Sequence, residues 1–230
     1  MVRTPHYSHI NQILCILVIL AVCFTCISHG LWTPDEPREA AISLEMARTG
    51  DFLIPHLAGT PFVEKPPLYY IVASFMLKTL GPITGNTTAI RLSTVLFGLG
   101  VLLMTFFLGR SIGGHEVGIF SAVFLGSMEG FAENFHWIRV DAALSFFVIA
   151  AVFCLFELYH KDNYKFGPLA GLCLAGSFLS KGLIGPVFIA VPWFLLFVER
   201  ITIHKHRPLS ALRKYLSISE KSCSLKRGAM

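Results

Sequence analysis

Long apolar runs recur along most of the chain, separated by short polar segments. Each run approaches the roughly 20 residues that a helix needs to cross a bilayer. The pattern therefore predicts an all-α integral membrane protein with about six transmembrane helices. The predicted spans are Ile10–Ser28, Ala89–Leu108, Val117–Phe135, Ala142–Tyr159, Tyr164–Ser180 and Gly182–Val198.

A seventh apolar run, Pro67–Leu80, is shorter and contains Lys78. Eight of the nineteen Lys and Arg residues lie from Arg200 onward, and basic segments favour the cytoplasmic side. Both ends of the chain lie on the cytoplasmic side only if Pro67–Leu80 does not cross the membrane. We therefore expect a juxtamembrane helix there, with a second one earlier in the same outer loop. The expected outer segments are residues 29–88, Asn134–Asp141 and Ser180-Lys181.

Composition agrees with the membrane assignment. Hydrophobic residues make up 54% of the chain and charged residues 14%, against about a quarter charged in soluble domains. The net charge of +5 does not indicate nucleic-acid binding, and the cysteines show neither disulfide-framework nor zinc-site spacing. We predict a membrane-embedded module over residues 1–198 and a basic cytoplasmic tail over residues 199–230.

The expected outer loop begins with a helix-start signature. Thr33 fits the N-cap, Pro34 the first helical position and Glu36 a capping box, while Gly50 would end the helix. Asp35 would lie in the first turn, where the helix dipole keeps a carboxylate ionised. It could then accept a proton, or it could only stabilise the helix start.

Other charged residues are expected on the same outer face. Asp141, after Arg139, opens the fourth predicted span and is either a helix-start acid or a second acid beside Asp35. Lys65 could bind a phosphate or extend its ammonium to the lipid headgroups. Lys181 lies between two apolar runs. Charges that converge on one membrane face are a functional-site hypothesis.

Several polar motifs resemble one family of membrane enzymes. Leu31–Ala40 (LWTPDEPREA), Gly50–Leu57 and Glu64–Pro67 resemble the first outer loop of polyprenyl-phosphate-dependent glycosyltransferases of the GT-C type. The likeness is to the 4-amino-4-deoxy-L-arabinose lipid A transferase group, which is related to the protein O-mannosyltransferases. Arg139–Asp141 and Ser180–Leu183 resemble later motifs of that group.

The resemblance implies inverting sugar transfer from a polyprenyl-phosphate carrier to a cell-envelope acceptor, either a lipid A-like glycolipid or a protein. The reaction would take place on the outer face of the plasma (inner) membrane. Asp35 and Asp141 match the catalytic acids, and Lys65 matches the lysine that binds the carrier phosphate. Glu64 matches a zinc-binding position of some members, which makes a divalent metal a candidate cofactor, although no partner histidine is found. The implied substrate-binding residues are Glu36, Lys65, Arg139 and Lys181.

Members of that group have many more spanning helices and a C-terminal outer domain. We therefore expect this chain to be the N-terminal part of such an enzyme, with a second chain as one source of the missing helices. The other expected partners are the polyprenyl-phosphate-linked sugar, its lipid or protein acceptor and membrane lipids. A transporter subunit and a catalytically inactive scaffold remain alternatives. A transporter would be expected to place charges near the bilayer midplane, and a scaffold would need neither Asp35 nor Lys65.

Overall fold

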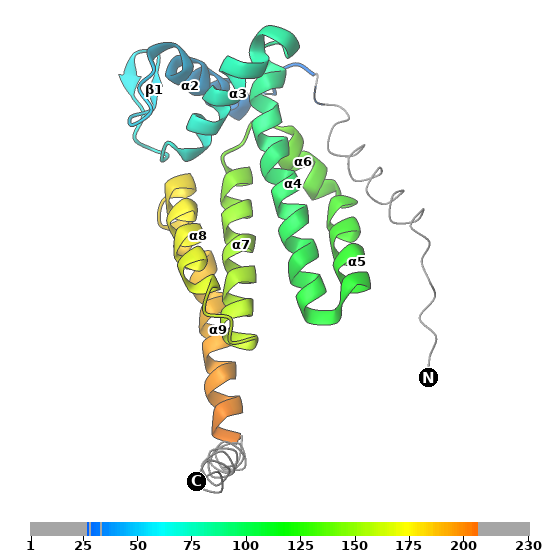
Figure 1. Cartoon of the computed structure of the whole chain (residues 1–230). Helices are drawn as coiled ribbons and strands as arrows, with labels where there is room; N and C mark the ends of the chain where they lie inside the picture. The colour runs from blue at the N-terminus through cyan, green and yellow to red at the C-terminus, as the bar shows by residue number, and fades with distance from the viewer. Residues whose placement is uncertain (1–26, 28, 33, 207–230) are drawn as a thin grey trace, which may run out of the picture.

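The computed structural model describes residue 27, residues 29–32 and residues 34–206. Three predicted features lie outside these residues: the first span apart from residue 27, the Thr33 N-cap, and residues 207–230 of the tail. Residues 199–206, predicted as the start of the tail, belong to the last helix. Helices make up nearly all of the described structure, as predicted, and one short hairpin adds the only described strands (Figure 1). The elements are α2 (Asp35–Thr49), β1 (His56–Leu57), β2 (Thr60–Pro61), α3 (Leu68–Thr84), α4 (Asn86–Gly113), α5 (His115–Gly126), α6 (Glu129–His136), α7 (Asp141–His160), α8 (Phe166–Lys181) and α9 (Ile184–His206).

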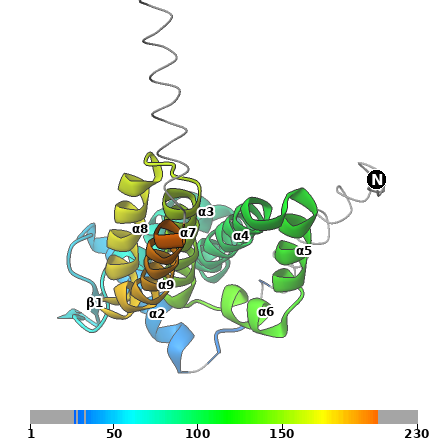
Figure 2. The ribbon, with the colours of Figure 1, turned by 90° about the horizontal axis from the view of Figure 1, so that it is seen from below.

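The long helices form an upright bundle. In the view along the bundle, α7 lies between the α8–α9 pair and α4, and α5 returns along the outer side of α4 (Figure 2). Within the described part of the chain, three helices are long and apolar enough to cross a bilayer: α4, α7 and residues Ile184–Ile201 of α9. The apolar helices α3 and α5 are shorter, so the total of six spans stays a prediction.

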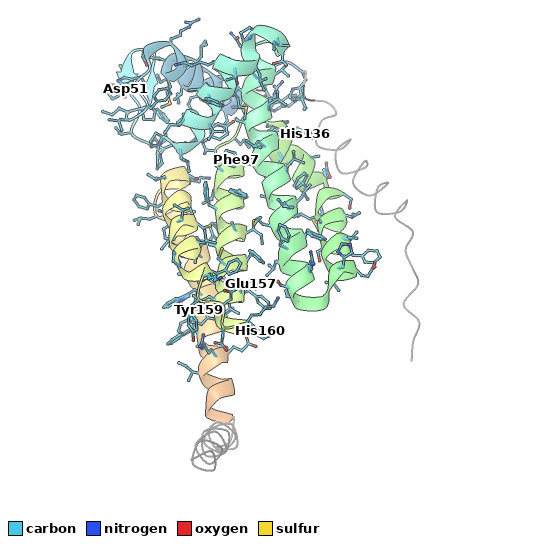
Figure 3. All side chains as sticks on the ribbon, in the orientation of Figure 1. Asp51, Phe97, His136, Glu157, Tyr159 and His160 are labelled. Atoms are coloured by element: carbon cyan, nitrogen blue, oxygen red, sulfur yellow. The ribbon has the colours of Figure 1, made fainter. Side chains whose placement is uncertain are left out.

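A layer made by α2, the β1–β2 hairpin and α3 covers one end of the bundle (Figure 1). The two strands pair in antiparallel register, with His56 opposite Pro61. The helix α3 lies in this layer and does not run along the length of the bundle, as expected of a juxtamembrane helix. Figure 3 labels Asp51 in this layer and Glu157, Tyr159 and His160 at the far end of α7.

The predicted third span is wrong as a single helix. The chain stops being helical after Gly126, and Met128 adopts an extended conformation before α6 begins at Glu129. Burial explains the break, because Phe131 and Phe135 pack into the core while Glu129 and Glu133 remain exposed. The helix α6 is thus a short amphipathic segment that returns the chain to the end of the bundle covered by α2 and α3.

Small residues allow α4 and α5 to approach closely. A Cβ atom built on Gly118 would lie 2.7 Å from the backbone oxygen of Phe106, and one on Gly109 would lie 3.0 Å from the Cα atom of Gly118. Glycine at such a contact lets two membrane helices gain van der Waals packing between their backbones. Gly114, at a φ of 90°, makes the turn between the two helices.

Candidate active site

The helix α2 turns two acidic side chains toward the protein interior. Glu36 and Glu39 are three residues apart, and Ile42 and Met46 continue the same helical face into the core. The helix ends at Gly50, whose left-handed conformation (φ 75°) lets its N–H donate to the oxygen of Met46. Both glutamates are almost completely buried. A buried carboxylate is costly unless hydrogen bonds and opposite charges compensate it, so the partners of these residues define the site.

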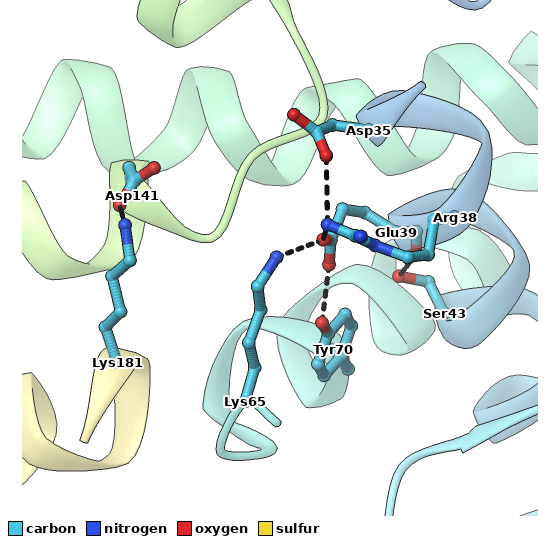
Figure 4. A network of polar contacts seen from close by, with 8 residues as sticks. All are labelled: Asp35, Arg38, Glu39, Ser43, Lys65, Tyr70, Asp141 and Lys181. Carbon is cyan, nitrogen blue, oxygen red and sulfur yellow. Dashed lines mark hydrogen bonds and ion pairs between the residues drawn. The ribbon is translucent and has the colours of Figure 1, made fainter. Parts of the chain in front are cut away.

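Glu39 is the centre of one polar network (Figure 4). Its Oε1 accepts hydrogen bonds from Lys65 Nζ at 2.5 Å and from Arg38 Nη2 at 3.3 Å, and its Oε2 accepts from the Tyr70 hydroxyl at 2.5 Å. Burial, followed by the charge of Glu39, raises the pKa of Tyr70 well above its usual range, so the hydroxyl remains a donor. The network joins α2, the segment before α3, and α3.

Asp35 lies at the solvent side of this network. Its side chain is 57% exposed and its Oδ1 accepts a hydrogen bond from Arg38 Nη2 at 2.9 Å. The same guanidinium group therefore contacts Asp35 and Glu39. An exposed carboxylate beside a cation can accept a proton from a bound hydroxyl group, which is the role that the sequence predicts for Asp35.

Asp141 and Lys181 form a second ion pair, drawn in the same close view (Figure 4). Asp141 begins α7 and Lys181 ends α8, so the carboxylate is at a helix N-terminus and the ammonium at a helix C-terminus. Each charge is on the side that the helix dipole favours. Both side chains remain about a third exposed, at 39% and 32%, and are open to a ligand.

Arg139 lies two residues before Asp141 but turns toward other partners. Its guanidinium carbon is 4.6 Å from the centroid of the Trp137 ring, and its Nη1 donates to Asn134 Oδ1 at 3.3 Å. Trp137 also stacks on Trp32, with ring centroids 6.0 Å apart. Arg139 therefore does not pair with Asp141, and its predicted substrate-binding role remains a prediction.

Glu36 has a different environment from the one predicted. Arg91 of α4 donates to both of its oxygens, from Nε at 3.1 Å and from Nη2 at 3.0 Å. Backbone N–H groups of Trp32 and Ile138 donate to the same carboxylate at 2.7 and 2.8 Å. Burial disfavours the charged form, but these four hydrogen bonds outweigh it and hold the pKa of Glu36 below its ordinary value.

The start of α2 differs from the expected capping box. Among the described residues, the N-cap is Pro34 without a side-chain cap hydrogen bond, and the Glu36 carboxylate accepts from the Trp32 N–H. The Glu36 carboxylate is buried and both of its oxygens accept hydrogen bonds, and its predicted substrate-binding role stays a prediction. Arg91 also donates to the backbone oxygens of residues 27, 29 and 30. The pair thus ties together the start of the loop, α4 and the segment before α7.

Glu64 is exposed, next to Lys65 in the segment before α3. In the described part of the chain, no three His, Cys, Asp or Glu side chains gather into a metal-binding group. His56 instead lies 4.0 Å from Asp51, a weak ion pair when the imidazole is protonated. A lone exposed glutamate does not fit a zinc site, which takes four ligands.

Three residues of these networks were not predicted as site residues: Glu39, Arg91 and Tyr70. Helical spacing indicated that Glu39 is buried. It shares one face of α2 with Ile42 and Met46, which are apolar and buried. Arg91 is the third residue of the predicted apolar helix Ala89–Leu108, and a charge at such a position indicates a buried partner. The partner itself is 55 residues away in sequence.

The chain is similar in sequence to known membrane glycosyltransferases. Residues 64–217 match the family model of dolichyl-phosphate-mannose-protein mannosyltransferases. The undecaprenyl phosphate-alpha-4-amino-4-deoxy-L-arabinose arabinosyl transferase 2 of Pseudomonas fluorescens is 29% identical over 187 residues, which cover 78% of this chain and 34% of the relative. The corresponding transferase of Edwardsiella ictaluri is 28% identical over 81% of this chain and 35% of its own length. The chain thus spans about a third of the length of these curated relatives.

The fold is also similar to solved structures. The crystal structure of ArnT from Cupriavidus metallidurans bound to undecaprenyl phosphate aligns with a TM-score of 0.71 at 19% identity, covering 88% of this chain and 43% of that one. The apo structure of the same protein gives 0.70 at 22% identity. The likeness supports the helical membrane fold. Because the family model covers more than half of the chain, this chain belongs to the dolichyl-phosphate-mannose-protein mannosyltransferase family of membrane glycosyltransferases.

Proposed function

We propose that this chain takes part in transferring a sugar from a polyprenyl-phosphate carrier to a cell-envelope acceptor. The observation that carries the proposal is the convergence of Lys65, Arg38 and Asp35 at one end of an apolar helix bundle. A cation for a phosphate and a base for a hydroxyl group are placed where a lipid carrier would present its sugar. Membership of a glycosyltransferase family supports the same reaction.

The reaction requires a base for the acceptor and stabilisation of the departing phosphate. An acceptor oxygen attacks the anomeric carbon of the sugar, and the bond from that carbon to the carrier's phosphate oxygen breaks with its electron pair on the phosphate. Asp35 takes the proton from the acceptor hydroxyl group. Lys65 and Arg38 stabilise the negative charge that grows on the departing phosphate. Attack from the face opposite the phosphate inverts the anomeric centre.

Asp141 and Lys181 supply a second charged pair at the same end of the bundle. We assign them to orienting the sugar or the acceptor, because both side chains are partly exposed and each can hydrogen-bond a hydroxyl group. The relatives from Pseudomonas and Edwardsiella are named for an undecaprenyl-phosphate-linked aminoarabinose donor. That name suggests the donor class here, with a lipid A-like glycolipid or a protein as acceptor.

We place the reaction on the outer face of the plasma (inner) membrane. These four side chains (Asp35, Lys65, Asp141 and Lys181) lie at one end of the bundle. Arg110, in the last turn of α4, and Lys161, which follows α7, lie at the opposite end, and basic segments favour the cytoplasm. A second chain that completes the helix bundle remains a proposed partner. No step is assigned to a metal, since Glu64 has no set of companion ligands among the described residues.

The experiment is a transfer assay in membranes that contain the chain, with undecaprenyl-phosphate-linked aminoarabinose as donor and lipid A as acceptor. Asp35→Asn should lower transfer by roughly 10²- to 10⁴-fold, the usual contribution of a general base. Asp51→Asn is the matched control in the same loop, because Asp51 accepts hydrogen bonds from the N–H groups of Leu53 and Ile54 and lies outside the network. Equal rates in wild type and Asp35→Asn would refute the assigned role. No transfer in wild-type membranes over a range of polyprenyl-phosphate donors would favour the scaffold or transporter alternative.

A further inference from the structure

The negatively charged Glu39 side chain contacts Lys65 and Arg38, the two cations that would bind a phosphate. Its carboxylate is 2% exposed and accepts from Lys65, Arg38 and Tyr70 at once. Figure 4 shows all three donor groups directed at this one side chain. The Lys65 side chain is 16% exposed, so a ligand can reach it from the solvent side.

The two cations of this network already have carboxylate partners, and the exposed Glu64 adds a further negative charge that acts on Arg38. Asp35 and Glu39 each contribute one negative charge, and Arg38 and Lys65 each contribute one positive charge. A phosphate entering the site therefore meets cations that already have carboxylate partners. Two anions near one ammonium group repel each other, and the repulsion is stronger away from bulk water. The phosphate must share Lys65 with Glu39 or displace it.

This competition has different consequences for donor and product. The sugar-linked carrier is a phosphodiester with one negative charge, whereas the carrier after transfer is a phosphomonoester with up to two. A site with uncompensated Lys65 and Arg38 would bind the product more tightly than the donor and release it slowly. Glu39 opposes the more highly charged species most strongly, because Coulomb repulsion scales with charge.

We propose that Glu39 is a positioning residue that sets the phosphate affinity of this site, holding Lys65 and Arg38 in the empty state and weakening the retention of polyprenyl phosphate after transfer. The inference rests on the proposed function, since it takes the carrier phosphate as the ligand of Lys65. This role and a purely structural role predict opposite changes in phosphate affinity when the charge of Glu39 is removed. A structural Glu39 would support Lys65, and its loss would weaken phosphate binding.

The test measures binding of undecaprenyl phosphate to the full chain in nanodiscs, with equilibrium affinity and dissociation rate as readouts. Glu39→Gln keeps the shape of the side chain and removes its charge. We expect roughly tenfold tighter binding and slower dissociation, because one repulsive charge a few ångströms from the phosphate is gone. Glu45→Gln removes the same charge from the same helix. The Glu45 carboxylate accepts a hydrogen bond from the Gly59 N–H and lies outside the network, so this variant should leave the affinity unchanged.

Weaker or unchanged binding in Glu39→Gln would overturn the inference. Glu39→Asp provides a second variant if Glu39→Gln does not fold, because the shorter carboxylate holds Lys65 less closely. It should bind undecaprenyl phosphate several-fold more tightly than wild type, and unchanged or weaker binding would again overturn the inference. Lys65→Ala separates the two proposals. If wild type binds and Lys65→Ala weakens binding, the proposed phosphate site stands whatever Glu39 does; if wild type does not bind, both proposals fail.

Discussion

The Arg91 guanidinium group donates two hydrogen bonds to the Glu36 carboxylate, at 3.1 and 3.0 Å, across 55 residues of sequence. Both side chains are buried, and each is compensated by the other and by backbone groups. Asp35 directly precedes Glu36 in the sequence. The N–H of Ile138 donates to Glu36, and Ile138 is three residues before Asp141. The pair therefore fixes the two segments that carry the candidate catalytic acids.

Removing one member of this pair should destabilise the protein strongly. Arg91→Ala leaves the Glu36 carboxylate buried without its cation, and such a loss costs about 3–5 kcal/mol. The free energy of unfolding in detergent micelles provides the measurement. Arg110→Ala is a suitable control, because Arg110 is an exposed arginine at the other end of the same helix. Comparable stability of the two variants would contradict the structural role of the pair.

The same pair predicts a pH dependence of stability. The pKa of Glu36 in the folded protein lies below its ordinary value of 4.5, so the unfolded chain binds the proton more readily. The contribution of Glu36 is complete above that ordinary value and is lost as the pH falls through the folded-state pKa. The unfolding midpoint of wild type should therefore drop on acidification more steeply than that of Glu36→Gln. Parallel pH profiles of the two proteins would contradict the assignment.

Asp141 and Lys181 should couple only weakly in stability. Both side chains are partly exposed, and water screens such a pair to roughly 0.2–1 kcal/mol. A double-mutant cycle with Asp141→Asn and Lys181→Gln, followed by thermal unfolding, measures this coupling, which should shrink as salt is added. A coupling of several kcal/mol would mean that the pair supports the fold and is not an accessible part of the site.

The contact between α4 and α5 depends on the absence of a side chain at Gly118. Gly118→Ala places a Cβ atom 2.7 Å from the Phe106 backbone oxygen, which forces the helices apart and should cost about 1–3 kcal/mol. Gly171→Ala in α8 is the control, since no atom lies within 4 Å of its added Cβ. That variant should be neutral or slightly stabilising. Equal stability of the two variants would show that α4 and α5 are not closely packed there.

Local sequence signals predicted much of the fold. Apolar runs identified α4, α7, α8 and α9, and the distribution of basic residues predicted that Pro67–Leu80, the segment of α3, does not cross the membrane. Gly50 marked the end of α2 because a left-handed residue commonly ends a helix. The break before α6 was not predicted, because Phe131 and Phe135 give this segment the hydropathy of a membrane span. The exposed residues Glu129 and Glu133 lie on the opposite face of the helix.

The candidate site was predicted in its residue types but not in its pairings. Charged residues that converge on one membrane face indicate a functional site. On that basis four residues were predicted: Asp35, Lys65, Asp141 and Lys181. Their partners depend on how distant segments pack: Lys65 meets Glu39 across 26 residues, and Lys181 meets Asp141 across 40. No local pattern specifies such contacts.

The most direct test of the central claim compares two lysines in the same region. Lys65 contacts Glu39, whereas Lys78 is exposed in α3 and its ammonium lies 5.2 Å from the centroid of the Phe52 ring. Sugar transfer from undecaprenyl-phosphate-linked aminoarabinose should fall by roughly 10²- to 10³-fold in Lys65→Gln, the usual effect of removing one stabilising group from a developing anion. Lys78→Gln should retain the wild-type rate. Transfer that survives Lys65→Gln, or that falls equally in both variants, would contradict the claim that Lys65 binds the carrier phosphate.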